Sequence, residues 1–103
     1  MKSIMRQDLT NVRCPDALLM LRKALGKLID TPEVKQLHVV AIEPSLPRDA
    51  KYALNHLELS LSMDVMIAPI SKDDRVKIDQ DDPDLLIGVT EFQLLRFSKA
   101  KSV

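Results

Sequence analysis

The stretch NVRCPDAL, residues Asn11–Leu18, decides how this chain is organised, because its single cysteine and a proline stand where the sequence pattern turns helical. Proline favours the first position of a helix, since its missing N–H would have no partner there and its φ is already fixed. Pro15 therefore predicts a helix start with Cys14 beside it. The free amides and the positive end of the helix dipole at such a place favour a sulfur anion. Cys14 is accordingly the candidate reactive residue.

Two stretches have the apolar spacing of helices that lie on a flat surface. The first runs from Pro15 to about Ile29, and its predicted core face consists of Ala17, Leu18, Leu21, Ala24, Leu25, Leu28 and Ile29. The second runs from about Pro47 to Leu61, and its predicted core face consists of Ala50, Ala53, Leu54, Leu57 and Leu61.

Short apolar or alternating runs predict the strands. The charged stretch 71–84, which contains Pro83, is expected to be a long loop or insertion, with a short strand at 76–78 as an option. Residues 91–97 either extend the last strand or form a helical turn, and the pattern does not decide between the two. The four predicted strands are 4–9, 37–42, 64–68 and 85–89.

The order strand, helix, strand, helix, strand, strand predicts an α+β fold, a two-layer α/β sandwich. In this β-α-β-α-β-β arrangement both helices pack on one face of a mixed four-stranded sheet. A length of 103 residues suits one domain with one core, so residues 1–103 are expected to form a single domain.

Charge and cysteine content limit the function classes. Fifteen basic and fifteen acidic residues balance, so direct binding of nucleic acid is not expected. No apolar run approaches the roughly 20 residues that a membrane span needs, and no secretory leader is evident. One cysteine makes neither an internal disulfide nor a multi-thiolate metal site. We therefore expect a cytoplasmic monomer without metal or cofactor.

The sequence resembles the TusA/SirA-like family of sulfur-carrier proteins at two places. The first is Val12-Arg13-Cys14-Pro15 with the helix after it, where the family has a Cys-Pro-x-Pro motif. The second is Glu43-Pro44-Ser45-Leu46-Pro47-Arg48-Asp49, which is similar to the family's acidic-Pro stretch before an Arg-Asp pair. The resemblance spans roughly residues 4–70. Ala17 replaces the second motif proline, so the motif reads Cys-Pro-Asp-Ala, and Asn11 replaces the glycine of the preceding turn.

The resemblance implies a sulfurtransferase-like carrier whose Cys14 accepts sulfane sulfur as a persulfide. Its partners would be a cysteine desulfurase or other donor protein and a downstream acceptor, in a relay toward tRNA thiolation. Arg13 adds positive charge beside the sulfur, Pro15 presents it, and Arg48 of the Arg48-Asp49 pair adds to the positive field if the two helices begin close together.

Several residues have a second interpretation. Leu19, Met20 and Lys23 lie on the polar side of the first helix and suit partner binding, although single exposed apolar residues are also common. Cys14 would be inert if it were buried. A Cys-His hydrolase would need His38 or His56 at the sulfur, and neither spacing indicates that. The whole chain could also be a non-catalytic binding or regulatory module that keeps the family fold.

Overall fold

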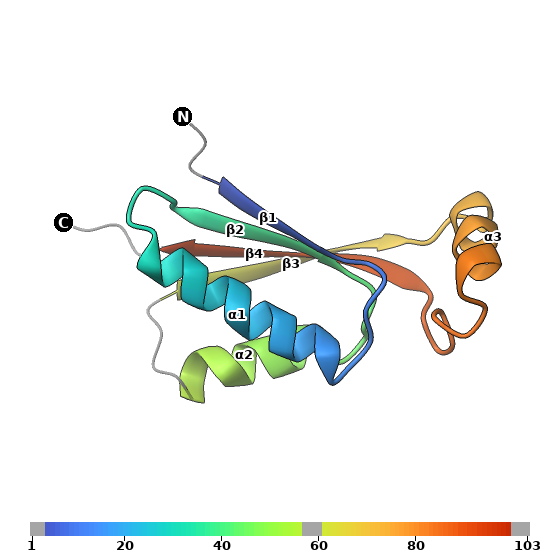
Figure 1. The fold of residues 1–103 in the computed structure, drawn as a ribbon, viewed down its shortest axis with the longest axis horizontal. Helices are drawn as coiled ribbons and strands as arrows, with labels where there is room; N and C mark the ends of the chain where they lie inside the picture. The colour runs from blue at the N-terminus through green and yellow to red at the C-terminus, as the bar shows by residue number, and fades with distance from the viewer. Residues whose placement is uncertain (1–3, 57–60, 100–103) are drawn as a thin grey trace.

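The computed structural model describes residues 4–56 and 61–99 and has two layers (Figure 1). One layer is a four-stranded sheet of β1 (Ile4–Leu9), β2 (Gln36–Ala41), β3 (Leu61–Pro69) and β4 (Glu91–Lys99). The other layer is formed by α1 (Asp16–Asp30) and α2 (Leu46–His56), which cover the same face of the sheet. The predicted α+β sandwich is therefore confirmed. A third helix, α3 (Lys72–Asp81), makes the element order β-α-β-α-β-α-β.

The strand order in the sheet is β1-β2-β4-β3. β1 runs parallel to β2, as a strand–helix–strand unit requires, and β4 lies antiparallel between β2 and β3. The parallel pair brings the carboxyl ends of β1 and β2 to one edge, with Leu9 opposite Ala41. The chain segments that carry Cys14 and Glu43 follow these two ends, so the topology brings them together.

The core lies between the sheet and the two helices. Alternate residues of β2 and β4 point into it, as the two-residue period of a strand dictates. Most of the core faces predicted for α1 and α2 are confirmed, but Ile29 is 44% exposed because it lies at the solvent edge of the last turn. The fully buried side chains of this core include Leu9, Ala17, Leu21, Leu28, Leu37, Val39, Leu46, Ala50, Leu95 and Phe97.

The second helix is shorter than predicted and the third strand is longer. α2 ends at His56, and Leu61 begins β3 rather than closing the helix's apolar stripe. Leu57 lies outside the described residues. β3 extends from Leu61 to Pro69 because every residue of that stretch is paired with β4, well beyond the predicted range 64–68.

The stretch 71–84 was predicted as a loop or insertion, and a loop is wrong for residues 72–81, which form α3. Ser71 caps α3, since its side chain accepts a hydrogen bond from the Asp74 amide at 3.1 Å. Two acidic residues in the first turn suit the positive end of the helix dipole. Residues 76–78, for which a short strand was the option, lie in α3 and are also helical. α3 stands at the end of the sheet opposite to the start of β1 and the end of β4 (Figure 1).

The strand predicted at 85–89 is also wrong. Residues 83–88 form turns, with Gly88 at a φ of 74°, a conformation that glycine adopts without the steric cost other residues have. The alternatives left open for residues 91–97 are settled in favour of a strand, because Glu91 begins β4. Among the helices of the described part, none is long and apolar enough to cross a membrane.

Candidate functional site

Cys14 lies directly before α1 and is exposed, with its thiol free. Pro15 occupies the N-cap position with φ −83° and ψ −10°, so the helix begins one residue later than its predicted start at Pro15. The first turn closes through the Ala17 amide, which donates to the Arg13 carbonyl at 3.0 Å, and the Leu19 amide, which donates to the Pro15 carbonyl at 3.2 Å. Cys14 is therefore not the buried thiol of the alternative interpretation.

The carboxylate of Glu43 fixes the backbone at the cysteine. Its Oε1 accepts hydrogen bonds from the Cys14 amide and from Arg13 Nε, both at 3.0 Å. Its Oε2 accepts from the Ser45 hydroxyl at 3.3 Å and from the Ser45 amide at 3.4 Å. The Ser45 Oγ in turn lies 3.6 Å from the Cys14 Sγ. One buried carboxylate thus joins the start of α1 to the segment that leads into α2.

Glu43 is ionised in this setting. Burial raises the pKa of the carboxyl, but hydrogen bonds from the Cys14 amide, the Arg13 side chain and the Ser45 amide, together with the Arg13 charge, outweigh burial and lower the pKa below its ordinary value. Such a charge is tolerated inside a protein because it is paired and its oxygens have donors.

The guanidinium of Arg13 binds Glu43 and the turns after α3. Beyond its bond to Glu43, its Nη1 donates to the carbonyls of Leu85 and Ile87, both at 2.8 Å. Arg13 therefore ties the cysteine segment to the turns after α3, at positions more than seventy residues further along the chain. Sequence reasoning expected its charge to support the sulfur, and this structural task was not foreseen.

An open hollow of about 580 Å³ lies at the cysteine. One side is formed by the exposed face of α1, where Leu19 is 54% exposed and Met20 37% exposed. The residues predicted as a partner-binding group therefore share one concave surface with Cys14. The lining comprises Asn11, Val12, Arg13, Cys14, Asp16, Leu19, Met20, Lys23, Asp82 and Leu85.

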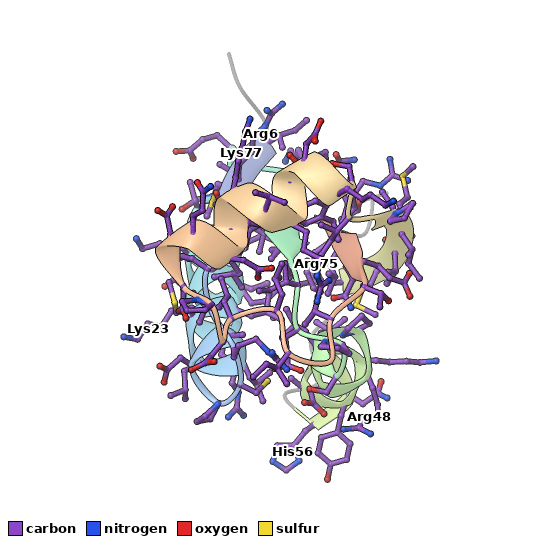
Figure 2. All side chains as sticks on the ribbon, turned by 90° about the vertical axis from the view of Figure 1, so that its right-hand side faces the viewer. Arg6, Lys23, Arg48, His56, Arg75 and Lys77 are labelled. Atoms are coloured by element: carbon purple, nitrogen blue, oxygen red, sulfur yellow. The ribbon has the colours of Figure 1, made fainter. Side chains whose placement is uncertain are left out.

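Arg48 and Asp49 do not join this hollow. They form an ion pair with each other on α2, with Arg48 Nε 3.4 Å from Asp49 Oδ1 and the Arg48 side chain 81% exposed. Figure 2 shows Arg48 beside α2 and Lys23 on the opposite side of the view, on α1. Within the described residues Arg48 makes no hydrogen bond to Cys14 or its neighbours. No contact therefore supports the expected contribution of Arg48 to a positive field at the sulfur.

The two histidines have other partners. His38 Nε2 lies 3.0 Å from the Gln36 side-chain oxygen on β2, and the His56 ring stacks on Tyr52 at the end of α2, with centroids 6.1 Å apart. Neither contact is with the thiol. Across residues 4–56 and 61–99, no three histidine, cysteine or acidic side chains gather closely enough to hold a metal ion.

Sequence reasoning assigned no site role to Glu43, Ser45, Asp82 and Leu85, although Glu43 and Ser45 lie in the second stretch of the family resemblance. For Glu43 a signal was present, because an acidic residue directly follows the apolar run of β2 and such a carboxylate needs partners when it is buried. For Asp82 and Leu85 there was none, since their position depends on the helix that the charge pattern concealed.

Comparison with known proteins gives no match: no family model, no curated protein and no solved structure corresponds to this chain.

Proposed function

We propose that this protein is a sulfur carrier that accepts sulfane sulfur on Cys14. The Cys14 thiolate attacks the terminal sulfur of a donor's cysteine persulfide, a new S–S bond forms on Cys14, and the donor's S–S bond breaks. The donor cysteine leaves as a thiolate and takes up the proton that Cys14 gave up. Sulfur oxidation states exchange between the two cysteines, so the step needs no external oxidant or reductant.

The observation that carries the proposal is the presentation of the thiol. The one cysteine of the chain is exposed at the start of a helix and lies in an open hollow rather than in the core. A carrier needs one accessible sulfur that two partner proteins can reach in turn, and it needs no second thiol. The similarity of the Cys14-Pro15 segment and the 43–49 segment to the TusA/SirA-like family supports the same chemistry.

The residues around Cys14 take distinct roles in this proposal. Glu43 holds the Cys14 backbone, and the Ser45 hydroxyl, 3.6 Å from the sulfur, turns its one proton from Glu43 Oε2 to the sulfur when the sulfur is anionic. Leu19, Met20 and Lys23 contact the partner on the exposed side of α1. Pro15 begins the helix that carries them.

The expected partners are a cysteine desulfurase or a comparable donor and a downstream acceptor in a cytoplasmic relay toward tRNA thiolation. The carrier acts as a monomer and meets each partner through the same concave surface. Its neutral overall charge suits contact with proteins rather than with the RNA itself.

One observation favours a different role, that of a non-catalytic binding module. The carboxylates of Asp16 and Asp82 line the hollow with Cys14, and the Glu43 carboxylate accepts the Cys14 amide, so three carboxylates stand against the two cations of the lining, Arg13 and Lys23. Like charges oppose formation of a sulfur anion. In that role the hollow would bind a partner without sulfur transfer.

Sulfur loading separates the two roles. The protein is incubated with a cysteine desulfurase and cysteine, and its intact mass is measured with and without a reducing agent. The proposal expects a gain of one sulfur atom that dithiothreitol removes and that Cys14→Ser abolishes. No gain on a protein whose Cys14 still reacts with iodoacetamide refutes sulfur transfer. Leu19→Gln should slow loading without slowing that alkylation, because Leu19 acts only through the partner and glutamine adds no charge beside the thiol.

A further inference from the structure

The turns after α3 are held by a second arginine as well as by Arg13. Arg75 on α3 donates from Nη1 to the Val89 carbonyl at 2.7 Å and from Nη2 to the Leu86 carbonyl at 3.2 Å. Residues 82–89, the 82–89 loop, therefore give four carbonyls to two guanidinium groups, those of Arg13 and Arg75. Loops seldom have so many charge-assisted bonds, and these fix the backbone in one position.

A small hydrophobic cluster fixes the loop from the inside. Leu86 and Val89 are each 1% exposed and pack on Ile42, which follows β2 and is fully buried. This cluster is separate from the main core between the sheet and the two helices. The side chains packed around it are Ile70, Ile78, Leu85 and Phe92. The 82–89 loop is consequently held in the fold by buried side chains as well as by hydrogen bonds.

The outer side of the loop faces the thiol. Asp82 and Leu85 line the hollow of Cys14 across from Leu19 and Lys23 of α1. We propose that the 82–89 loop is a specificity wall of this hollow, which admits a narrow protruding segment to Cys14 and holds back a broad surface. Arg75 is the positioning residue that keeps the wall in place.

The wall also defines the kind of partner that fits. A donor with its reactive cysteine on a protruding loop reaches between the wall and α1, whereas a donor with the cysteine on a flat face does not. The lining suits a segment that places an apolar side chain against Leu19, Met20 and Leu85. The kind of partner inferred here rests on the proposed sulfur transfer, whereas the effect of the wall on access to Cys14 does not.

Figure 2 provides a matched pair of residues on α3. Arg75 lies between the helix and the loop, whereas Lys77 projects away from it, and both carry one positive charge. Arg75 is half-buried and Lys77 exposed. Arg75→Ala removes both bonds to the loop, and Lys77→Ala removes the same charge without touching the loop.

The test measures alkylation of Cys14 by iodoacetamide and by an iodoacetamide that carries a rhodamine group, on the folded protein without any sulfur donor. Arg75→Ala should raise the rate of the bulky reagent about tenfold, because loss of bonds from a charged donor raises the population of the displaced loop by about that factor, and leave the small reagent unchanged. Lys77→Ala should match the unmodified protein with both reagents. An unchanged ratio of the two rates in Arg75→Ala overturns the proposal, and so does an equal rise with both reagents.

A second variant keeps the test valid if Arg75→Ala fails to fold. Leu85→Ala shortens the wall while leaving the carbonyls of the loop in place, so it should raise the same ratio by a smaller factor. An unchanged ratio in this variant overturns the wall. Sulfur loading by a desulfurase is measured separately, so a protein that shows size selection but takes up no sulfur refutes only the proposed function.

Discussion

Removal of the Glu43 carboxylate should destabilise the protein at neutral pH more than any exposed charge does. Glu43 is 7% exposed, and its two oxygens accept four hydrogen bonds from Cys14, Arg13 and Ser45. Glu43→Gln keeps the shape and one oxygen, so it retains the two bonds at 3.0 Å but loses the charge and the two longer bonds. The expected cost is about 2 kcal/mol of unfolding free energy.

Glu43→Ala should lower the unfolding free energy by more, about 4 kcal/mol, because it leaves Arg13 Nε and the Cys14 amide without their acceptor. The Arg13 side chain remains 33% exposed, so water replaces part of what is lost and a larger cost is not expected. Urea unfolding followed by circular dichroism gives both values, provided that the slope with denaturant is unchanged.

The pH dependence gives an independent check of the cause. The pKa of Glu43 is lower in the folded protein than its ordinary value of 4.5, so its ionised form stabilises the fold. This contribution is complete above about pH 4.5 and is lost as the pH falls through the lowered pKa. The difference between the protein and Glu43→Gln should therefore shrink as the pH falls through that lowered pKa.

Asp8→Asn is the matched control. Hydrogen bonds from the Thr10 hydroxyl and then from the Thr10 amide lower the pKa of Asp8 as well, but they lie in an exposed turn. Loss of the Asp8 carboxylate should lower the unfolding free energy by only about 0.5 kcal/mol. If Glu43→Gln were no more destabilising than Asp8→Asn at neutral pH, or if its cost were the same in acid, the argument for a buried organising carboxylate would fail.

Three further substitutions have defined outcomes. Ala17→Pro, which restores the second motif proline, removes the 3.0 Å bond from the Ala17 amide to the Arg13 carbonyl, so it should cost about 1 kcal/mol and leave sulfur loading, measured by intact mass, no higher. Arg96→Ala breaks the 2.8 Å ion pair with Asp64, whose side chains are 40% and 59% exposed, and should change the unfolding free energy by less than about 1 kcal/mol; a larger loss would contradict the solvent-screening argument. Gly88→Ala meets no atom within 4 Å but keeps a φ of 74°, so thermal unfolding should show a cost of about 1 kcal/mol from backbone strain alone, and an unchanged melting temperature would contradict it.

The two-layer fold could be predicted because its elements have clear periods. α1 buries Ala17, Leu21, Ala24, Leu25 and Leu28 in a stripe that winding at 100° per residue places on one face. β2 is an apolar run of the length of a strand, flanked by turn residues. Both elements pack on the main core, so tertiary structure agrees with the local pattern.

α3 could not be predicted from such a stripe, because only a small part of it faces inward. Arg75 and Ile78, three residues apart, turn toward the protein, and the other face is charged and solvated. An arginine that binds carbonyls looks in a sequence like any surface charge. The signal that existed was the cap, in which Ser71 precedes acidic residues at 73 and 74.

The apolar run 85–89 was wrongly predicted as a strand, because distant side chains decide its structure. Strands satisfy their carbonyls with a neighbouring strand, whereas these carbonyls bind Arg13 and Arg75. The buried residues Leu86 and Val89 are three apart and pack on Ile42. Without knowledge of those distant arginines, the composition of the run favours a strand.

The position of the site could be predicted from the sequence, but the contacts of Arg13 within it could not. The motif places a positive charge beside Cys14, yet the guanidinium goes to Glu43 and to the 82–89 loop, thirty and more than seventy residues away. The residue that precedes the cysteine in sequence therefore holds a loop that lines the same hollow. Because Glu43 accepts hydrogen bonds from both Arg13 and the Cys14 amide, one chain of hydrogen bonds joins this loop to the backbone of the cysteine.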